Sequence, residues 1–457
     1  MADKPRFRKF KQKQGLGDRY YIHENTNISD IRGLHVPREA LKQIQRNSNN
    51  NLIGAYQFAI EGGGYNTIIT VPKFCDIYNC SQEDMDLLFV KYMSLYRDLV
   101  KEGYKGKRQL DDNIRDFNLN DVTDLDGAMK IKYVQSLKEI KRFFHSHKSV
   151  SNKRNNFHSS SISNAIDIKK NILEINKSKI HQYNEVEFNY SEIANVAYVC
   201  LNHFRKQVQP MLGACEAIDK EIKQLSGFLK RHVVKRFKID NKYFQIHSLV
   251  RPNIRKLFKN SSDKNKLYTN LLTLVCGDTI DSADKKITNL ISLYFSPEIM
   301  FEMHVERLLN QSSDYSVKNQ PIIQSNLQLF NEDGQESEPT VLSTHDNRPD
   351  HLVSINDNDL VIVLDSKWKK ITQYSQIVET DVLKLVRDRR AISIKEEYKN
   401  KRVLQGLVYP ELPANLEEFK SLSFDYDSKE SFFILSLPLF NQDQSEVNVA
   451  NLAKLHF

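Results

Sequence analysis

Two aspartates and a lysine at the ends of two apolar runs have the residue types for metal-dependent chemistry. Residues 348–370 read RPDHLVSINDNDLVIVLDSKWKK, where Asp350 precedes the first run and Asp365 and Lys367 follow the second. Two carboxylates placed close together raise each other's pKa unless a cation lies between them, and Mg²⁺ prefers carboxylate oxygens as ligands. A lysine on the same side could contact a phosphate that the metal holds. The alternative is that both aspartates simply reach solvent at the end of a sheet.

The two apolar runs are expected to form a β-hairpin. The run LVIVL is typical of a strand buried on both faces, and side chains two apart share a face, so Asp365 and Lys367 should project together. If the turn is centred between Asp357 and Asn358, Asp350 lies directly opposite Asp365. A loop of three or five residues would shift this pairing.

A helix ahead of the hairpin could bring a third carboxylate. In SPEIMFEMHVERLLN, Ser296 is the expected N-cap and Pro297 the first helical residue. Glu298, Glu302 and Glu306 follow at intervals of four and therefore lie on one helix face. The residues alone do not choose among these three, and a solvated acidic face is expected for at least two of them.

A second helix is expected after the hairpin, within residues 375–398. Its residues Arg387, Arg389 and Arg390 could contact DNA phosphates, although an exposed basic helix face fits them equally well. Trp368, the only tryptophan, alternates to the face opposite Lys367, where core packing is expected.

These segments resemble a known family of nucleases. RPD, followed by fourteen residues and then DSK, resembles the PD-(D/E)XK nuclease motif. FSPEIMFEMHVERLL, RPDHLV, LVIVLDSKWK and LVYP, in that order, resemble McrC, the nuclease subunit of the GTP-dependent McrBC restriction systems, over residues 290–440. The LlaJI-type branch, in which a related subunit serves a sequence-specific system, is also similar. Near the amino end, TIITVPKF resembles a short strand-Pro-Lys element of the same family.

The resemblance implies roles for individual residues. Asp350 and Asp365 would be metal ligands, with the carbonyl oxygen of Ser366 as a third, and Lys367 would orient or activate the attacking water. From the three glutamates the family pattern selects Glu302 as the catalytic carboxylate. The implied cofactor is Mg²⁺, for which Mn²⁺ could substitute.

The resemblance also implies partners. They are double-stranded DNA and a separate McrB-like AAA+ GTPase, which the amino-terminal region would dock on and stimulate, with higher-order assembly on this motor. GTP would bind only to that partner. In agreement, the glycines at 62–64 are not followed by Gly-Lys-Ser/Thr, and the sequence contains no Walker-type loop.

Length and composition predict a multidomain globular protein of α+β or α/β class. The chain has 457 residues, enough for two or three domains, and its 40% hydrophobic residues exclude a disordered chain. We expect a small mixed α/β amino-terminal domain over 1–125 and a basic linker with a helical middle region over 126–290. Residues 291–457 are expected to form a PD-(D/E)XK restriction-endonuclease-like core, with a mixed central sheet flanked by helices.

The net charge of +8 is concentrated in the middle region. Residues 129–180 contain twelve Lys and Arg against three Asp and Glu. Such a cluster suits contact with a phosphate backbone and equally suits a solvated loop.

No feature of the sequence indicates a membrane or secreted protein. No stretch approaches the roughly 18 uninterrupted apolar residues of a membrane span, and the basic start lacks the apolar core of a secretory signal. Five cysteines, an odd number, suit reduced thiols. We therefore expect a cytoplasmic protein.

The favoured interpretation is a Mg²⁺-dependent endodeoxyribonuclease subunit of a two-component anti-phage restriction system. Two alternatives stay open: a non-catalytic adaptor that binds DNA and the motor, and a self-sufficient restriction endonuclease. The sequence does not predict the recognised DNA site, its methylation dependence or the stoichiometry.

Overall fold

The computed structural model of the chain describes residues 7–10, 18–24, 26, 36, 41, 44–45, 51–59, 65–73, 75–104, 125–146, 153–159, 165–166, 168–173, 179–186, 190–212, 215–232, 252–259, 261–276, 290–329, 340–355, 359–424 and 427–452. The triple glycine, parts of the basic segment 129–180 and the hairpin turn at 356–358 lie outside them.

The first sheet has five strands in the order β1-β2-β4-β3-β8, in which β2 and β4 are parallel and the other pairs antiparallel. Its strands are β1 (Phe7–Phe10), β2 (Arg19–His23), β3 (Ile53–Ala59), β4 (Tyr65–Val71) and β8 (Leu290–Phe295). β8 begins at the expected boundary between the middle and carboxyl-terminal regions, yet it extends the amino-terminal sheet. Pairing between strands so far apart in sequence leaves no local signal.

Helix α3 (Gln82–Lys101) covers one face of this sheet. It begins with a capping box, since Ser81 accepts from the Asp84 backbone N–H and the Asp84 carboxylate accepts from that of Ser81. Tyr21 and Ile69 point towards α3, while neighbours such as Ile68 form a smaller cluster on the opposite face.

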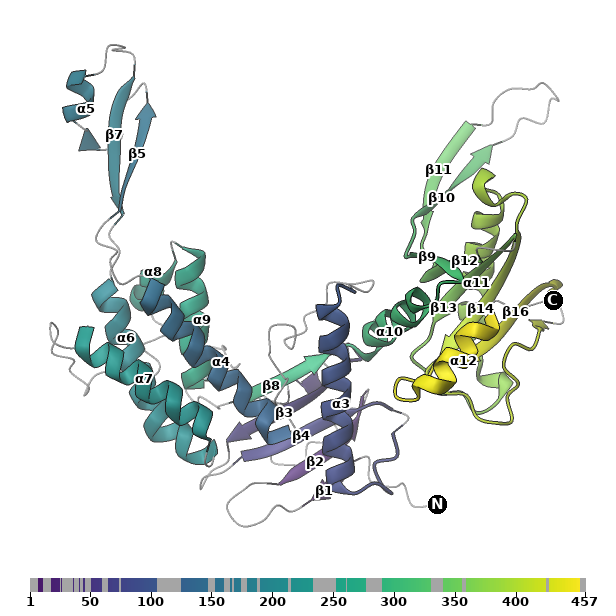
Figure 1. Cartoon of the computed structure of the whole chain (residues 1–457), viewed down its shortest axis with the longest axis horizontal. Coiled ribbons are helices and arrows are strands. Elements are labelled where there is room, and N and C mark those ends of the chain that lie inside the picture. Colours follow the sequence, from purple (N-terminus) through teal and green to yellow (C-terminus); the bar gives the residue numbers. More distant parts are fainter. Residues whose placement is uncertain are drawn as a thin grey trace.

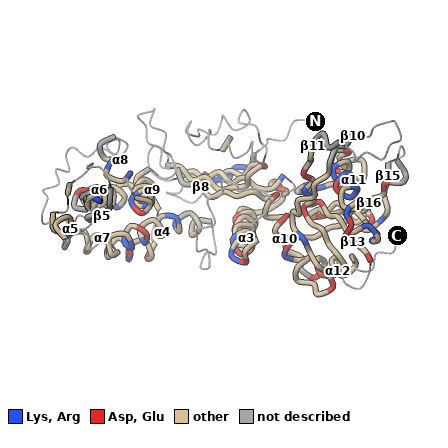
Figure 2. The backbone as a smooth tube through the Cα atoms, turned by 90° about the horizontal axis from the view of Figure 1, so that it is seen from above, with Lys and Arg blue, Asp and Glu red and all other residues tan. Residues whose placement is uncertain are grey.

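The middle region is mostly helical. It comprises α4 (Leu125–Ser146), α5 (Ile168–Leu173), α6 (Tyr190–His203), the π-helix η2 (Phe204–Val208), the 3-10 helix η3 (Gln209–Leu212), α7 (Glu216–His232), α8 (Pro252–Phe258) and α9 (Ser262–Cys276). Basic and acidic residues both occur on the longer helices α4, α7 and α9 (Figure 2).

A small sheet projects from the helices, a feature that the sequence did not predict (Figure 1). Its strands, in the order β5-β7-β6, are β5 (Lys153–Ser159), β6 (Ala165–Ile166) and β7 (Ile180–Val186). It lies within the segment that was expected to be a linker.

The carboxyl-terminal sheet has six strands in the order β15-β16-β14-β13-β12-β9. They are β9 (Tyr315–Asn319), β12 (His351–Ile355), β13 (Leu360–Ser366), β14 (Arg402–Tyr409), β15 (Leu422–Phe424) and β16 (Asp427–Ser436). The pairs β13–β14 and β14–β16 are parallel and the rest antiparallel, so the sheet is mixed. Next to it, β10 (Ile323–Leu329) and β11 (Thr340–Asn347) form a two-stranded sheet, and η5 (Tyr374–Gln376) and η6 (Glu396–Tyr398) are 3-10 turns.

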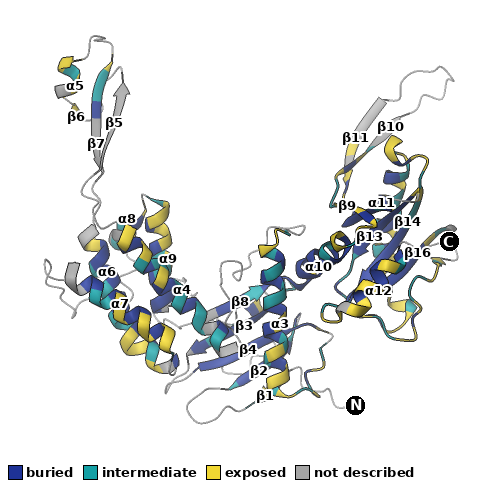
Figure 3. Cartoon of the chain, viewed as in Figure 1, coloured by how far each residue is buried: buried dark blue, intermediate teal, exposed yellow. Residues whose placement is uncertain are grey.

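Helices cover both faces of the six-stranded sheet. Val361 and Val363 of β13 pack in a cluster with residues of α11 (Glu379–Ser393). Ile362 and Leu364 pack in the main core with residues of α10 (Pro297–Gln311) and α12 (Gln442–Leu452). β13 is therefore buried on both faces, as its apolar run predicts, and Figure 3 shows it in dark blue. The described chain is a mixed α+β protein, which confirms the predicted class at that level.

The β12–β13 hairpin has the predicted register. His351 pairs with Leu364 and Val353 with Ile362, which places Asp350 and Asp365 opposite each other at the open end. The helix before the hairpin also begins as predicted, with Ser296 accepting a hydrogen bond from the Ile299 backbone N–H and proline in its first turn. Among the helices that the structure describes, none is long and apolar enough to cross a membrane.

Candidate active site

A cavity of about 460 Å³ lies where α10, the end of β13, the first turns of α11 and the end of β4 meet. Four carboxylates and four lysines line it: Glu298, Glu302, Asp350, Asp381, Lys73, Lys367, Lys369 and Lys384. The lining thus combines acids that can hold a cation with ammonium groups that can hold an anion.

Of the two aspartates, Asp350 lines this cavity, and Asp365 is buried beside it at the end of β13. Asp350 is 5% exposed and Asp365 only 1%. The Ser366 backbone N–H donates to Asp350 Oδ2 at 2.9 Å, which fixes Asp350 against the end of β13. Lys384 Nζ lies 3.5 Å from Asp350 Oδ1 and also contacts Asp365 Oδ1, so one ammonium bridges the two carboxylates.

The electrostatics of the pair agree with the expectation from the sequence. Burial is the main cause that raises the pKa of Asp365, and the nearby Asp350 raises it further, whereas Lys367 and Lys384 lower it. The two carboxylates are therefore costly to keep ionised together without a cation between them.

Lys367 projects to the same side as Asp365, as the strand alternation predicts. Its ammonium contacts Asp365 Oδ2 and lies 3.4 Å from Asp381 Oδ1. Burial lowers the pKa of Lys367, but the two carboxylates outweigh burial and leave the pKa above its ordinary value. Lys367 is therefore a charged hydrogen-bond donor at neutral pH.

The structure separates the three glutamates of α10. Glu302 is buried, lines the cavity and accepts a hydrogen bond from Gln320 Nε2 at 3.2 Å. Glu298 also lines the cavity, and Asn51 Nδ2 donates to it at 3.3 Å. Glu306 does not line the cavity and accepts instead from Asn319 Nδ2 at 2.8 Å. The geometry leaves Glu302 and Glu298 as candidates.

The three arginines of α11 do not line the cavity. Arg389 and Arg390 form ion pairs with Glu430 at 2.5 and 2.9 Å, and Arg387 lies 3.3 Å from Asp388. Contact between these arginines and DNA stays a prediction, and it would take place outside the cavity.

Two residues of α11 that do face the site, Asp381 and Lys384, were not predicted from the sequence. Asp381 and Lys384 are three residues apart on the helix and Asp388 follows four later, so all three share one face. The signal available in the sequence was this alternation of charge, from Asp381 to Lys384 to Asp388, on one face of the expected helix. Lys369, which pairs with Asp381 at 2.6 Å, was also missed.

The donor oxygens fit a divalent cation. The Lys384 ammonium already lies between Asp350 Oδ1 and Asp365 Oδ1, which shows that both oxygens can face one cation. Both are hard oxygen donors of the kind Mg²⁺ takes, and Glu302 and Ser366 line the same cavity. Within the described residues, no group of three or more His, Cys, Asp or Glu side chains is placed so that it could hold a metal ion.

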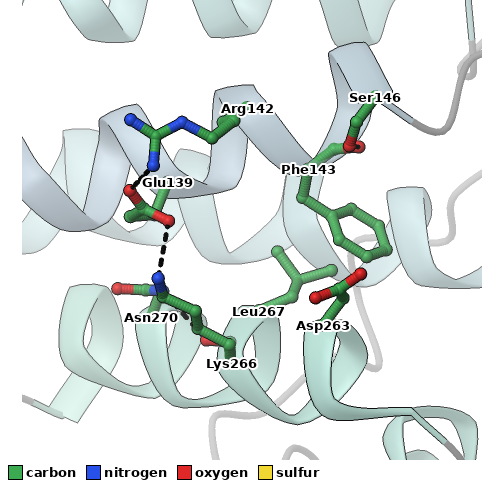
Figure 4. A pocket seen from close by; sticks show the side chains of 8 residues that line it. All are labelled: Glu139, Arg142, Phe143, Ser146, Asp263, Lys266, Leu267 and Asn270. Atoms are coloured by element: carbon green, nitrogen blue, oxygen red, sulfur yellow. Dashed lines mark hydrogen bonds and ion pairs between the residues drawn. The ribbon is translucent and has the colours of Figure 1, made fainter.

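A second cavity, of about 240 Å³, lies between α4 and α9 (Figure 4). Glu139 there pairs with Arg142 and, at 3.1 Å, with Lys266. Phe143 and Leu267 form its apolar part. Glu139 thus contacts both cations of the lining, one within α4 and one across to α9.

Fold and site together define a mixed α+β protein in which a buried pair of aspartates lies beside a cavity that Asp350 and four lysines line, at the junction of two sheets. No known family model matches the sequence, and no curated protein matches it. Two solved structures are similar in part. One is an assembly of Thermococcus gammatolerans McrB AAA+ hexamers with bound McrC, which matches at 10% identity over 92% of this chain and 90% of that chain, with a TM-score of 0.40. The other is the Thermococcus gammatolerans McrBC complex, at 12% identity over 56% of this chain and 66% of that chain, with a TM-score of 0.22. At these identities and TM-scores the likenesses assign neither a family nor an activity.

Proposed function

We propose that the chain is a Mg²⁺-dependent DNA endonuclease subunit of a two-component, McrBC-like restriction system. The observation that carries the proposal is the register of the β12–β13 hairpin, which sets Asp350 opposite Asp365. Lys367 contacts Asp365 from the same strand end, and Glu302 lines the cavity from α10. This is the order and spacing of the PD-(D/E)XK motif that the sequence resembles.

The side chains have complementary roles in hydrolysis of a phosphodiester. Asp350 and Asp365 would hold the cation, which when bound supplies Lewis-acid neutralisation of phosphate charge. Lys367, kept charged by Asp365 and Asp381, donates a hydrogen bond that orients the attacking water and stabilises negative charge on the phosphate. The water oxygen bonds to phosphorus as the bond between phosphorus and the 3′ oxygen breaks, and a water proton ends on that oxygen, so the products are a 5′-phosphate and a 3′-hydroxyl.

The motor is proposed to be a separate chain. The sequence has no Walker-type loop, so GTP hydrolysis requires a partner such as a McrB-like AAA+ GTPase. Recognition of a DNA sequence or of methylation would then reside largely in that partner.

A cleavage assay on long methylated and unmethylated DNA separates this proposal from its alternatives. The purified chain with Mg²⁺ is compared with the chain plus Mg²⁺, GTP and a McrB-like AAA+ protein. We expect cleavage only in the complete mixture and loss of cleavage in Asp350→Asn, with the complex still assembled in size-exclusion chromatography. Cleavage by the chain alone would indicate a self-sufficient endonuclease, and DNA binding without cleavage in every mixture would indicate an adaptor.

A further inference from the structure

The amino-terminal and carboxyl-terminal sheets meet at Trp368, the residue that directly follows Lys367. Trp368 is 4% exposed, and its ring packs against Tyr92 of α3, with ring centroids 6.2 Å apart, and Phe301 of α10, at 5.9 Å. Core packing was expected for this tryptophan. The contact with α3, on the amino-terminal side of the chain, was not.

One carboxylate oxygen of Glu24 joins the two sheets. Glu24 Oε1 accepts from Trp368 Nε1 at 3.0 Å and from the Lys73 backbone N–H at 3.1 Å. Trp368 and Lys73 both line the cavity, the first at the end of β13 and the second just past β4. This single oxygen therefore sets the relative position of two parts of the cavity wall that are 295 residues apart in sequence (368 − 73).

The local topology explains why Glu24 reaches this place. β2 and β4 are parallel and paired up to His23 and Val71, so both strands end at the same edge of the sheet. The Glu24 backbone N–H continues the ladder by donating to the Val71 carbonyl at 2.9 Å. The Glu24 side chain therefore extends from this edge of the sheet towards Lys73, which follows β4.

The environment of Glu24 is costly for the fold. The residue is 3% exposed, and its Oε2 is buried without a hydrogen bond from any residue that the structure describes. Burial is the main cause that raises the pKa of Glu24, and Lys73 and Trp368 only partly offset it. A buried carboxylate with one unsatisfied oxygen is destabilising, so packing alone would favour an apolar side chain or an amide.

We propose that Glu24 is a positioning residue of the candidate active site: through Trp368 it fixes the end of β13, and with it Lys367, relative to Lys73 and the amino-terminal sheet. The effect on cleavage rests on the proposed function, whereas the contact with Trp368 does not. The amino-terminal region is thereby part of the site in addition to any role in binding a motor.

Trp368 is the only tryptophan, so its fluorescence reports this junction alone. Glu24→Leu removes the acceptor, and we expect the emission of the full-length protein to shift to longer wavelength as water reaches the ring. Glu24→Gln keeps a carbonyl acceptor and should leave the emission as in the wild type. As a matched control, Ile68→Val weakens the opposite face of the same sheet, where Ile68 packs away from Trp368, and should not move the emission.

The same variants are compared for cleavage of DNA in the complete mixture. We expect Glu24→Leu to lower kcat by about 10- to 100-fold with KM unchanged, the effect of misplacing a reacting group. Glu24→Gln should restore cleavage, and Ile68→Val should cleave as the wild type. If Glu24→Leu does not fold, Trp368→Phe keeps a packed ring without the N–H donor and should show the same loss of kcat.

Three results would overturn the proposal. These are wild-type emission in Glu24→Leu, a wild-type rate in Trp368→Phe, and an equal loss of kcat in Ile68→Val, which would mark a general effect of stability. If the wild type cleaves no DNA, the proposed function fails, and the emission of Glu24→Leu against Glu24→Gln still decides whether Glu24 holds Trp368.

Discussion

The chemistry of the site depends on a few charged side chains that neutralise one another in a buried place. Asp350 and Asp365 are kept together by Lys384 and Lys367, and without these cations the buried carboxylates would repel. The opposition of the aspartates could be predicted, because strand alternation and a tight turn fix the register. Lys384 could not be assigned from the hairpin, since the rotation of α11 about its axis depends on packing.

Lys367 is expected to contribute through its charge. Lys367→Gln removes the ammonium and should lower the cleavage rate by about 100-fold, the loss typical of a single transition-state donor. The matched control is Lys370→Gln, because Lys370 lies on the same chain segment but pairs with the exposed Glu411 at 3.4 Å. Equal rates for both variants in a single-turnover assay would remove Lys367 from the mechanism.

A cation site at the aspartates predicts a stability effect that does not depend on activity. Mg²⁺ should raise the Tm of the wild type, and should raise that of Lys384→Met more, because that variant leaves the two carboxylates with one ammonium fewer. Asp350→Asn should abolish the increase. The Tm is measured by differential scanning fluorimetry at increasing Mg²⁺ concentration. If Mg²⁺ raises the Tm of Asp350→Asn as much as that of the wild type, the cation binds elsewhere.

At the scale of elements, the helices and strands with a strong local sequence pattern were predicted. The strand pairings that depend on segments far away in the sequence were not. The hairpin and α10 carry their signals in strand periodicity, the Ser296 cap and Pro297. The pairing of β8 with β3 and the small β5-β7-β6 sheet have no comparable local pattern, since each depends on contacts outside the segment.

Helix α10 should make stability depend on pH through His304. Burial, with the nearby Arg307, lowers the pKa of His304 to about 4, while its Nε2 hydrogen bonds with the Pro438 carbonyl at 3.3 Å. The folded state therefore favours the neutral ring. Its contribution to stability is complete above the ordinary pKa of 6.5 and is lost as the pH falls towards 4.

We expect this histidine to account for a loss of up to about 3 kcal/mol in the free energy of unfolding between neutral and acid pH. His304→Gln can keep the donor to Pro438 and does not titrate. Urea unfolding at pH 7 and pH 4.5 should therefore show a smaller decrease for the variant than for the wild type. Parallel decreases would mean that His304 is not buried as described.

At the scale of the whole molecule, the cavity lies between two sheets rather than within one. Glu24, Lys73 and Asn51 come from the amino-terminal sheet or its flanking turns and contact or line the cavity wall. The sequence predicted separate regions because each has its own periodicity. It could not predict that the buried face of α10 packs against α3.

The predicted carboxyl-terminal region should therefore not be independent. A fragment of residues 291–457 lacks Glu24 and Tyr92, which cover Trp368, and splits β8 from β3. We expect its Trp368 emission to lie at longer wavelength and its Tm to be lower than in the full chain. Wild-type emission and an unchanged Tm would show that the junction contributes nothing to this region.

The most direct test of the central claim is the single-turnover rate of DNA cleavage by Asp365→Asn. Asp359→Asn is its matched control, because Asp359 is an exposed aspartate at the other end of the same strand. Measured with Mg²⁺, GTP and the AAA+ partner, cleavage should fall at least about 100-fold in Asp365→Asn and stay at the wild-type rate in Asp359→Asn, with assembly intact in both. If Asp365→Asn cleaves DNA as fast as Asp359→Asn, the paired aspartates are not a catalytic centre.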